Sequence, residues 1–455
     1  MKREKILQAL DEISDAHIEK AATPPKRKRK SIYWYSGIAA VLVIAILLGI
    51  FLPTGKSPAD EMVGSNAKVL AAASYPETKP ADDYKDILAH ADDLNDYFRR
   101  TMAQFLQDEQ GNDNMAFSPI NLYMALAMLA ETTDGQTRAE ILSLLGAEDM
   151  DSLRKQANEL WLSIYSKEEP TCTLANSIWI QDGVSYNEET VKTIAEKYFA
   201  SVYSNNFAAP NAAKPIAQWI DKETGGLLKE QTAQLQFDPR TVMALVSTVY
   251  MKANWTDPFK EERNTQRVFH GTNGDVTRTF MNKSYSDNYY WGDDYTAVSV
   301  GLEWGYSMKL ILPDEGKTPN DLLQSGAYTE LLRSGAAKGK YTIINLSMPK
   351  FDITCKQNMI DGLTELGIKQ VFEMGQADFS SAFPEMANEI AVGKVEQATR
   401  VSVDEDGIEA ASYVVIGGEG GGAPKDEVDF VLDRPFLFVI THRNIPIFAG
   451  VVNNP

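Results

Sequence analysis

The sequence contains few of the residues on which catalytic and metal sites most often depend. Its 455 residues include two cysteines, Cys172 and Cys355, and four histidines that are scattered singly. Neither cysteine belongs to a C-x-x-C or Cys/His spacing, so no zinc site is predicted. Two buried free thiols are the expected arrangement, because free cysteine is usually buried. The sequence does not decide whether Cys172 and Cys355 form a disulfide.

Positive charge is also scarce in most of the chain. The formal net charge is -19 at pH 7, and residues 1–31 carry 9 Lys or Arg against 5 Asp or Glu. These first residues are therefore +4, which leaves -23 for the remainder. A body that acidic repels nucleic-acid phosphates, and no basic stripe with interleaved aromatic residues occurs in it. We therefore do not expect nucleic acid as a partner.

The common catalytic motifs are missing as well. There is no G-x-S-x-G, no H-E-x-x-H, no Walker-type G-x-x-x-x-G-K-[ST] and no G-x-G-x-x-G that opens a helix. The run GGEGGGAP, residues 417–424, continues into a proline and lacks the Lys-Ser/Thr of a phosphate-binding loop. Asp404, Glu405 and Asp406 are adjacent, and adjacent residues of an extended chain point to opposite faces. The sequence therefore predicts neither an enzyme nor a cofactor or metal site.

One long hydrophobic run is present near the N-terminus. Residues 32–52, IYWYSGIAAVLVIAILLGIFL, carry no charge, and at 1.5 Å per residue such a helix spans about 30 Å, the thickness of the bilayer core. The basic run KRKRK, residues 26–30, directly precedes it. The positive-inside rule then predicts a single-pass transmembrane helix with residues 1–31 in the cytoplasm and the rest outside. No small-residue cleavage site follows, which argues against a removed signal peptide.

The remaining chain divides into a linker and one body. Residues 53–84 are rich in Ala, Pro, Lys, Asp and Ser, and a flexible linker of this length has an r.m.s. span of about 30 Å. Residues 85–455 contain no second low-complexity break and no repeat of fixed period. Helical periodicity dominates early and strand-like runs dominate late, which predicts an α+β fold.

Local signals place some elements of this body. Ser118 followed by Pro119 predicts the start of a helix, and a further helix is predicted from Gly135–Thr137 to Gly146. The run TVMALVSTVYM, residues 241–251, has too few polar positions for a one-sided sheet. It predicts a strand that is buried on both faces.

Eight stretches in order resemble one family, the serpins. They are NMAFSPINLYMALAML (114–129), GQTRAEI (135–141), LVSTVYMKANWTDPF (245–259), LPDEG (312–316), MPKFDI (348–353), VDEDGIEAA (403–411), DRPFLFVI (433–440) and IFAGVVNNP (447–455). The resemblance covers about residues 85–455 and implies the serpin fold, with about nine helices around three β-sheets and an exposed reactive-centre loop. The short cytoplasmic tail and sparing use of cysteine favour a bacterial source.

The resemblance also implies a function. Members of the family offer the loop as bait to a serine or cysteine protease, which cleaves it and forms an acyl-enzyme. The freed loop then inserts into the main sheet as a new strand and deforms the attached protease before water can release it. We therefore expect a protease inhibitor that acts as a monomer, with the target protease and the membrane as its partners. The alternative is a non-inhibitory surface binding protein on the same scaffold.

The loop itself has a pattern that suits insertion. If Ile408 points inward, then Ala410, Ser412, Val414 and Ile416 point inward too, because side chains of a strand alternate. All of these side chains are apolar or small. The resemblance assigns the hinge to the following residues: Glu405, Gly407, Ile408, Glu409, Ala410, Ala411 and Ser412. Ile408 stands where the family prefers Thr or Ser, so entry of the hinge into the sheet must bury a larger group.

The family's spacing places the scissile bond at Gly421–Gly422. A glycine bait offers no side chain to the protease's primary pocket. Three nearby residues are alternatives, because each would suit a different protease: Glu419, Ala423 and Lys425.

The resemblance further implies a polar cluster where the sheet opens. The family uses two serines, an asparagine and a histidine there. Ser118 matches the first serine, and we expect three substitutes at the other positions: Asn121, Ser247 and Ser347. Trp255 matches the family's tryptophan at the point where the loop first enters the sheet.

Overall fold

The computed structural model describes residues 67–73, 75, 85–108, 110–165, 171–333, 335–408 and 426–455, with the backbone alone for 85–93 and 171. The predicted cytoplasmic tail and the predicted transmembrane helix, residues 32–52, lie outside this part of the chain. Among the described residues no helix is both long and apolar enough to cross a bilayer.

The helices are concentrated in the first half of the described chain, as the sequence predicts. The α-helices are α3 (Lys85–Leu106), α4 (Pro119–Thr132), α5 (Gly135–Leu145), α6 (Met150–Ile164), α7 (Glu188–Lys197), α8 (Ala213–Glu223), α9 (Lys229–Thr232), α10 (Pro319–Ser325) and α11 (Ile360–Glu365). Short 3-10 helices are η1 (Glu261–Arg263), η2 (Glu303–Gly305), η3 (Ala327–Leu332), η4 (Gln370–Phe372) and η5 (Pro384–Met386).

The predicted helix boundaries are confirmed where the sequence carries capping signals. Ser118 is the N-cap of α4, its side chain accepts a hydrogen bond from the Asn121 N–H, and Pro119 occupies the first helical position. Helix α5 ends at Gly146, whose left-handed backbone (φ 69°) makes the cap.

The first of two sheets has seven strands in the order β1-β4-β3-β5-β13-β12-β11. Its strands are β1 (Ala67–Ala71), β3 (Thr171–Gln181), β4 (Ala200–Asn205), β5 (Met243–Asn254), β11 (Phe351–Asn358), β12 (Glu396–Val403) and β13 (Gly407–Ile408). Strand β1 pairs with β4 at the edge of the sheet. Since β1 lies within the segment predicted as a linker, that segment is not unstructured throughout.

The second sheet has nine strands, eight in the order β14-β10-β7-β8-β9-β15-β16-β2 and β6 beside β7. These are β2 (Met115–Phe117), β6 (Thr265–Gly271), β7 (Gly274–Gly292), β8 (Tyr295–Gly301), β9 (Tyr306–Pro313), β10 (Lys338–Pro349), β14 (Glu427–Val431), β15 (Phe436–His442) and β16 (Ile445–Val452). Among the described residues the strands therefore form two hydrogen-bonded sheets rather than the three expected. The reason is β7, whose 19 residues pair with β10 and then with β8, and so join two groups of strands.

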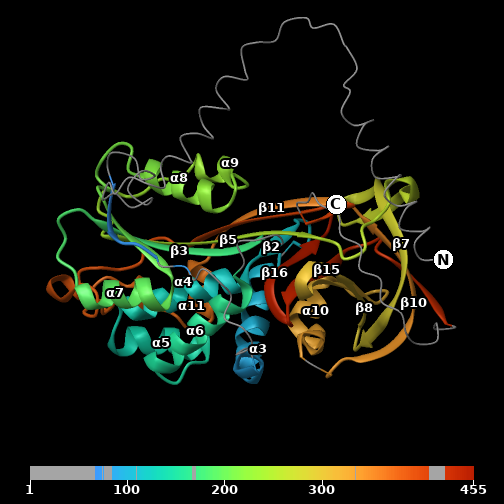
Figure 1. Cartoon of the computed structure of the whole chain (residues 1–455), viewed down its shortest axis with the longest axis horizontal. Coiled ribbons are helices and arrows are strands. Elements are labelled where there is room, and N and C mark those ends of the chain that lie inside the picture. Colours follow the sequence, from blue (N-terminus) through green and yellow to red (C-terminus); the bar gives the residue numbers. More distant parts are fainter. Residues whose placement is uncertain are drawn as a thin grey trace, which may run out of the picture. The chain divides into compact units, whose positions relative to one another are not determined.

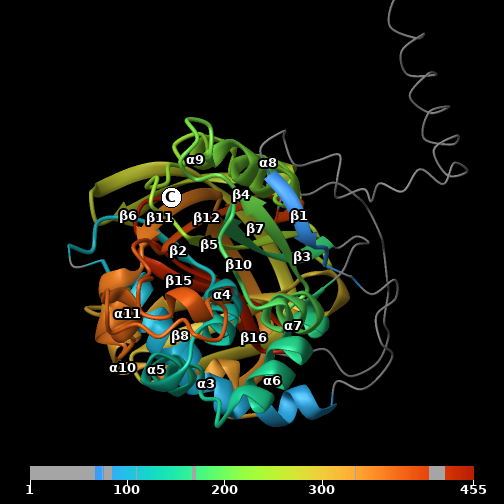
Figure 2. The ribbon, with the colours of Figure 1, turned by 90° about the vertical axis from the view of Figure 1, so that its left-hand side faces the viewer.

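Helices cover both faces of the seven-stranded sheet (Figures 1 and 2). Helix α4 packs against β3 and β5 on one face, and α8 packs against β5 on the other. Beneath α8 lies a separate apolar cluster, which includes Trp179, Tyr203 and Trp219. Side chains of β3 alternate between the two faces of the sheet, which explains why there are two clusters. Leu174 and Ile178 belong to the main core, whereas Ala175 and Trp179 belong to this cluster.

Strand β5 differs from its predicted burial. Most of its residues are half-buried rather than buried on both faces. Along residues 243–252 the only described strand beside β5 is β3, so one edge of β5 has no described neighbour there.

Two further observations concern the core and the surface. Both cysteines are buried and free, so no disulfide joins them.

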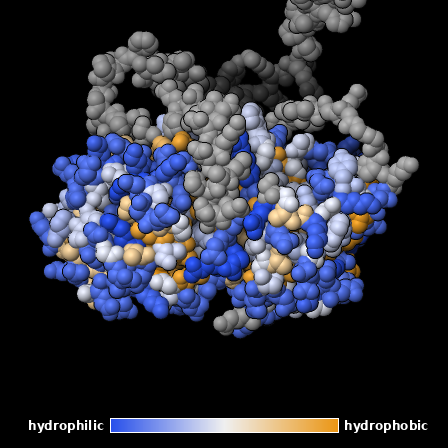
Figure 3. Space-filling model, turned by 90° about the horizontal axis from the view of Figure 1, so that it is seen from below, coloured by the Kyte–Doolittle hydropathy of each residue, from blue (hydrophilic) through white to orange (hydrophobic). Residues whose placement is uncertain are grey.

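On the face shown in Figure 3, the hydrophobic residues of the described part lie in small groups among hydrophilic ones.

Candidate functional site

The candidate site lies in the seven-stranded sheet, where β13 lies between β5 and β12. Gly407 and Ile408 pair antiparallel with Asn254 and Ala253 of β5. On its other side Ile408 pairs with Val403 of β12. Among the described residues β5 and β12 belong to one sheet only through this two-residue strand. The site is therefore a two-residue strand between β5 and β12, and the residues that follow it, 409–425, lie outside the described part of the chain.

Both residues of β13 fit closely into this position. A Cβ atom on Gly407 would lie 2.3 Å from the Ala253 carbonyl oxygen and 2.7 Å from the Asn254 Cα. Those are backbone atoms of a paired strand and cannot move aside, so only glycine fits. Ile408 is 5% exposed and packs into the main core. A residue larger than the family's usual Thr or Ser is therefore accommodated here.

A tight turn leads into β13. The Asp404 carboxylate accepts hydrogen bonds from the backbone N–H groups of Asp406 and Gly407, at 3.0 and 3.2 Å. The Asp404 N–H donates to the Gly407 carbonyl oxygen. Aspartate at the first position of such a turn stabilises it, because its side chain satisfies N–H groups that have no strand partner.

Trp255 fastens this turn to the end of β5. Its indole Nε1–H donates to the Asp404 carbonyl oxygen at 2.8 Å, and its backbone N–H donates to the Asp406 carbonyl oxygen at 2.9 Å. The side chain is 1% exposed and contacts the Phe259 ring edge to face. The structure thus places Trp255 beside the first residues of the hinge.

Glu405 carries the buried charge of the site. Its carboxylate forms an ion pair with Lys350 at 2.5 Å and accepts a short hydrogen bond from the Asn264 side chain. Burial by itself raises the pKa of Glu405, but the bonds from Lys350 and Asn264 outweigh it and hold the pKa below its ordinary value. The carboxylate is therefore ionised at neutral pH and ties the turn to residues outside the seven-stranded sheet.

A polar group connects β12 with the start of α4. The Gln397 side chain accepts from the Ser118 N–H at 2.8 Å and donates to the Ser118 carbonyl oxygen at 3.0 Å. The Ser118 hydroxyl donates to the Ile447 carbonyl oxygen at 2.7 Å. The Thr399 hydroxyl completes the group by donating to the Gln397 amide oxygen. All of these side chains are buried.

The predicted polar cluster of four residues is only partly assembled. Asn121 lies in the first turn of α4, one turn beyond Ser118. The Ser247 hydroxyl donates to the Asn176 amide oxygen at 2.8 Å, which links β5 to β3. Ser347 lies elsewhere, in β10 of the nine-stranded sheet, opposite Asn282 of β7.

Gln397 occupies the position against α4 that was expected for Ser347. Sequence reasoning missed it, although one signal was available. Gln397, Thr399, Val401 and Val403 are the buried positions of β12. An amide at an inward position of a strand requires hydrogen-bond partners, and so indicates a polar contact beneath the sheet.

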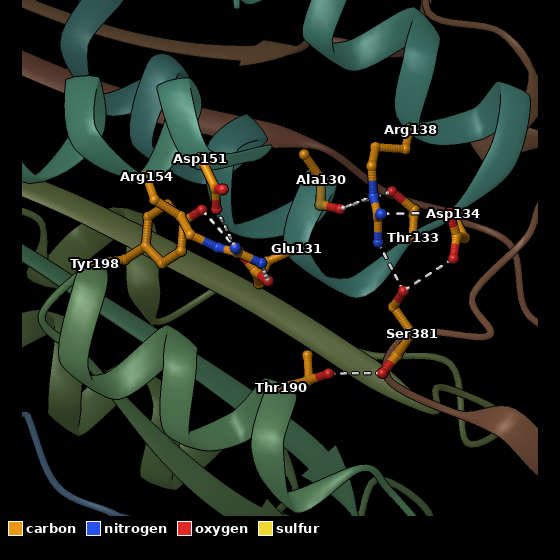
Figure 4. Close-up of polar contacts among 10 residues, drawn as sticks. All are labelled: Ala130, Glu131, Thr133, Asp134, Arg138, Asp151, Arg154, Thr190, Tyr198 and Ser381. Atoms are coloured by element: carbon orange, nitrogen blue, oxygen red, sulfur yellow. Dashed lines mark hydrogen bonds and ion pairs between the residues drawn. The ribbon is translucent and has the colours of Figure 1, made fainter. Parts of the chain in front are cut away.

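Helix α4 is also fixed at its C-terminal end (Figure 4). The buried Glu131 carboxylate accepts two hydrogen bonds from Arg154 of α6, at 2.9 and 2.6 Å, and one from the Tyr198 hydroxyl at 2.9 Å. Arg138 of α5 donates to the Ala130 carbonyl oxygen and to the Ser381 hydroxyl. With Ser118 at one end and Glu131 at the other, α4 forms a rigid support under β3 and β5.

Part of the predicted site lies outside the described residues. This holds for the hinge residues Glu409, Ala410, Ala411 and Ser412, and for the bait residues Glu419, Gly421, Gly422, Ala423 and Lys425. In the part of the chain that the structure describes, no group of three or more His, Cys, Asp or Glu side chains could hold a metal ion. The described residues of the site can hold and position a strand.

Comparisons with known proteins agree with the motifs. The family model described as "Serpin (serine protease inhibitor)" matches residues 93–455. An uncharacterized serpin-like protein of Thermococcus kodakarensis is 29% identical over 357 residues, which cover 76% of this chain and 81% of that protein. Serpin-ZX of Arabidopsis thaliana is 28% identical over 367 residues, covering 76% and 93%.

A solved structure shows the same architecture. The thermophilic serpin tengpin in its native state superposes with a TM-score of 0.73 at 25% identity, covering 86% of this chain and 100% of that one. These relatives include an archaeal and a plant protein, so a bacterial source for this chain stays a prediction. The match over residues 93–455, together with the fold, shows that the chain belongs to the serpin family.

Proposed function

We propose that the protein inhibits serine or cysteine proteases by trapping the acyl-enzyme through insertion of its reactive-centre loop. The observation that carries this proposal is β13, because Gly407 and Ile408 already pair with both β5 and β12. The chain continues from Ile408 directly into the loop. Insertion then requires only that a strand which has already begun be extended.

The register of β13 predicts where the inserted residues would lie. Since Ile408 lies opposite Ala253 and Val403, an antiparallel continuation places Val414 opposite Ser247 of β5 and Gln397 of β12. The inward residues of the loop would then point toward α4, and the outward ones toward the other face. Each apolar side chain buried in this way contributes about 1.5–3 kcal/mol. Each ladder hydrogen bond adds about 0.5–1.5 kcal/mol net.

The mechanism needs no catalytic group of the inhibitor. The protease nucleophile attacks the carbonyl carbon of the bait bond, and the new amino terminus leaves with the C-terminal fragment. The protease remains attached as an ester or thioester to the N-terminal part of the loop. Extension of β13 then carries the protease along the sheet, away from the end where the loop begins. Gly421–Gly422 is the proposed bait bond.

The test uses the full chain in detergent, incubated with a panel of serine and cysteine proteases. We expect complexes that survive denaturing electrophoresis, and mass spectrometry of the released peptide locates the bait bond. Val414→Lys would place a charge on the inward face, whereas Val415→Lys places the same charge on the outward face. We therefore expect Val414→Lys to be cleaved without forming complexes, and Val415→Lys to inhibit like the wild type.

Two readouts decide the outcome. Cleavage of the loop should raise the melting temperature by about 10 °C or more, since a few kcal/mol shift the transition of a large domain by several degrees. Cleavage of the wild type with neither a covalent complex nor a rise in melting temperature contradicts the proposal.

We also propose that the inhibitor is anchored in a membrane by residues 32–52, with the serpin body outside the cell. The support is the length of this uncharged run and the basic residues that precede it. At this location the protein would act on proteases that reach the cell surface.

A further inference from the structure

A groove of about 370 Å³ lies on the outer face of β7, β10 and β14. The following paired residues form its floor: Asn282 and Ser284 of β7, Asn345 and Ser347 of β10, and Asp429 and Val431 of β14. Their side chains share one face, because they alternate with residues that point to the core, such as Leu346 and Phe430. Arg263 of η1 and Arg267 of β6 also line the groove. We call this surface the arginine groove.

The charge of the arginine groove differs from that of the whole chain. Arg263 and Arg267 are exposed, and no carboxylate among the described residues pairs with either guanidinium. The one carboxylate of the floor, Asp429, accepts a hydrogen bond from the Asn345 side chain at 3.0 Å. With Lys283, which pairs with Asp257, the lining holds three basic residues against one carboxylate, in a chain whose net charge is -19. They make this surface attractive to carboxylates.

An unused hydrogen-bonding group lies on the floor of the groove. The hydroxyl oxygen of Ser347 has no partner, although the residue is only 4% exposed. Leaving a buried hydroxyl unpaired costs about 1–3 kcal/mol. The oxygen has less than 1 Å² of accessible surface, so it lies beneath the groove rather than facing a ligand in it. The side chain that does not belong to the predicted polar cluster thus lies under this second surface.

An exposed tyrosine extends the same face. Tyr341 of β10 alternates with Asn345 and Ser347 on the outer side and is 56% exposed. Tyrosine and arginine are the residue types most enriched at the energetic centres of protein–protein interfaces. Their occurrence together favours a protein as the occupant of this face.

The arginine groove lies next to the segment that the protease would cleave. Strand β14 starts at Glu427, five residues after Gly422, so the bait bond is within about 17 Å of β14 along the chain. A protease is wider than this distance. A protease bound at the bait bond is therefore close enough to contact β14 and its neighbour β10. A glycine bait gives little discrimination by itself, so a second contact surface can supply it.

We infer that the arginine groove is a docking surface for the target protease, and that it selects proteases with acidic residues beside their active site. The inference rests on the proposed function. The exposed Arg263 and Arg267 would pair with carboxylates of the protease, while the exposed Tyr341 contacts its surface. The pairing accelerates association, because opposite charges at an interface act mainly on the rate of encounter.

The test separates docking from inhibition by using trypsin whose catalytic serine is replaced by alanine. Anionic and cationic trypsin share a primary specificity and differ in surface charge, and Gly421→Arg gives both a suitable bait. We compare association rates for the full chain carrying Gly421→Arg alone with those after adding Arg263→Glu and Arg267→Glu. The matched control instead adds Lys192→Glu in α7 and Lys229→Glu in α9, which change the net charge by the same amount. In Figure 1, α7 and α9 lie to the left of β7 and β10.

We expect the chain to bind inactive anionic trypsin faster than cationic trypsin at low salt. The two arginine substitutions should reduce the association rate with anionic trypsin about tenfold and flatten its salt dependence. The two lysine substitutions should change it less than twofold. Equal rates for the arginine variant and the control, or no binding of either inactive trypsin at low salt, overturn the inference. If active proteases form no covalent complexes, the proposed function is overturned. The association rates with inactive trypsin still test the docking surface independently.

Discussion

At the scale of single residues, Glu405 contributes most to holding the start of the inserted strand. Its carboxylate is 9% exposed, and bonds from Lys350 and Asn264 join the turn before β13 to residues outside the seven-stranded sheet. Because the pKa of Glu405 in the folded protein lies below its ordinary value of 4.5, the ionised carboxylate stabilises the fold. This contribution is fully present above about pH 4.5 and is lost as the pH falls through the lowered folded-state pKa.

We therefore predict that Glu405→Gln lowers the free energy of unfolding at pH 7 by about 1–3 kcal/mol, the usual cost of losing a charge-assisted bond to a buried group. The substitution should also reduce the loss of stability between pH 5 and pH 3, since the titrating carboxylate is gone. Urea unfolding at a series of pH values measures both effects. Glu396→Gln is the control, because Glu396 is 28% exposed and its ion pairs should count for less than about 1 kcal/mol. Equal pH profiles for wild type and Glu405→Gln would contradict this assignment.

At the scale of elements, the contact between β12 and α4 depends on one amide. Gln397 satisfies both the N–H and the carbonyl group of Ser118, and Ser118 is 1% exposed. We predict that Gln397→Leu, which keeps the volume and removes the amide, destabilises the protein by about 2–4 kcal/mol, since two buried backbone groups lose their partners. Gln266→Leu in β6 removes an exposed amide bonded to Thr279 and should cost less than about 0.5 kcal/mol. Denaturant midpoints measure the loss of stability in the two variants. Similar midpoints would show that water replaces the amide of Gln397 and would contradict this prediction.

The same contact shows what the sequence could and could not predict. The boundaries of α4 and α5 were predictable, because Ser-Pro and Gly146 act through local hydrogen bonds and backbone angles. Gly407 was singled out by the resemblance, but the reason that only glycine fits there, contact with the β5 backbone, depends on pairing with a strand distant in sequence. The inward amide of Gln397 was a local signal, but its partner Ser118 lies 279 residues away, and no local pattern links the two. The pairing of β7 with both β10 and β8, and the edge of β5 that has no described neighbour, likewise depend on tertiary pairing, which periodicity alone does not contain.

At the scale of the whole molecule, β1 is the first described element after the predicted transmembrane run. Strand β1 begins at Ala67 and pairs with β4, so the segment between the hydrophobic run and the folded body is 53–66 rather than 53–84. A flexible segment of 14 residues has an r.m.s. span of about 20 Å, shorter than the 30 Å expected for the longer linker.

We predict that the full chain, produced in a bacterial host, stays in the membrane fraction after carbonate extraction, and that a chain lacking residues 1–52 does not. In spheroplasts a membrane-impermeant amine reagent should label lysines of the body, such as the exposed Lys192 and Lys229. Replacing the five basic residues 26–30 with glutamate removes the charge that sets orientation, so labelling of intact spheroplasts should fall while membrane association remains. Recovery of the full chain in the soluble fraction, or labelling only after lysis, would show that residues 32–52 do not anchor the body outside the cell.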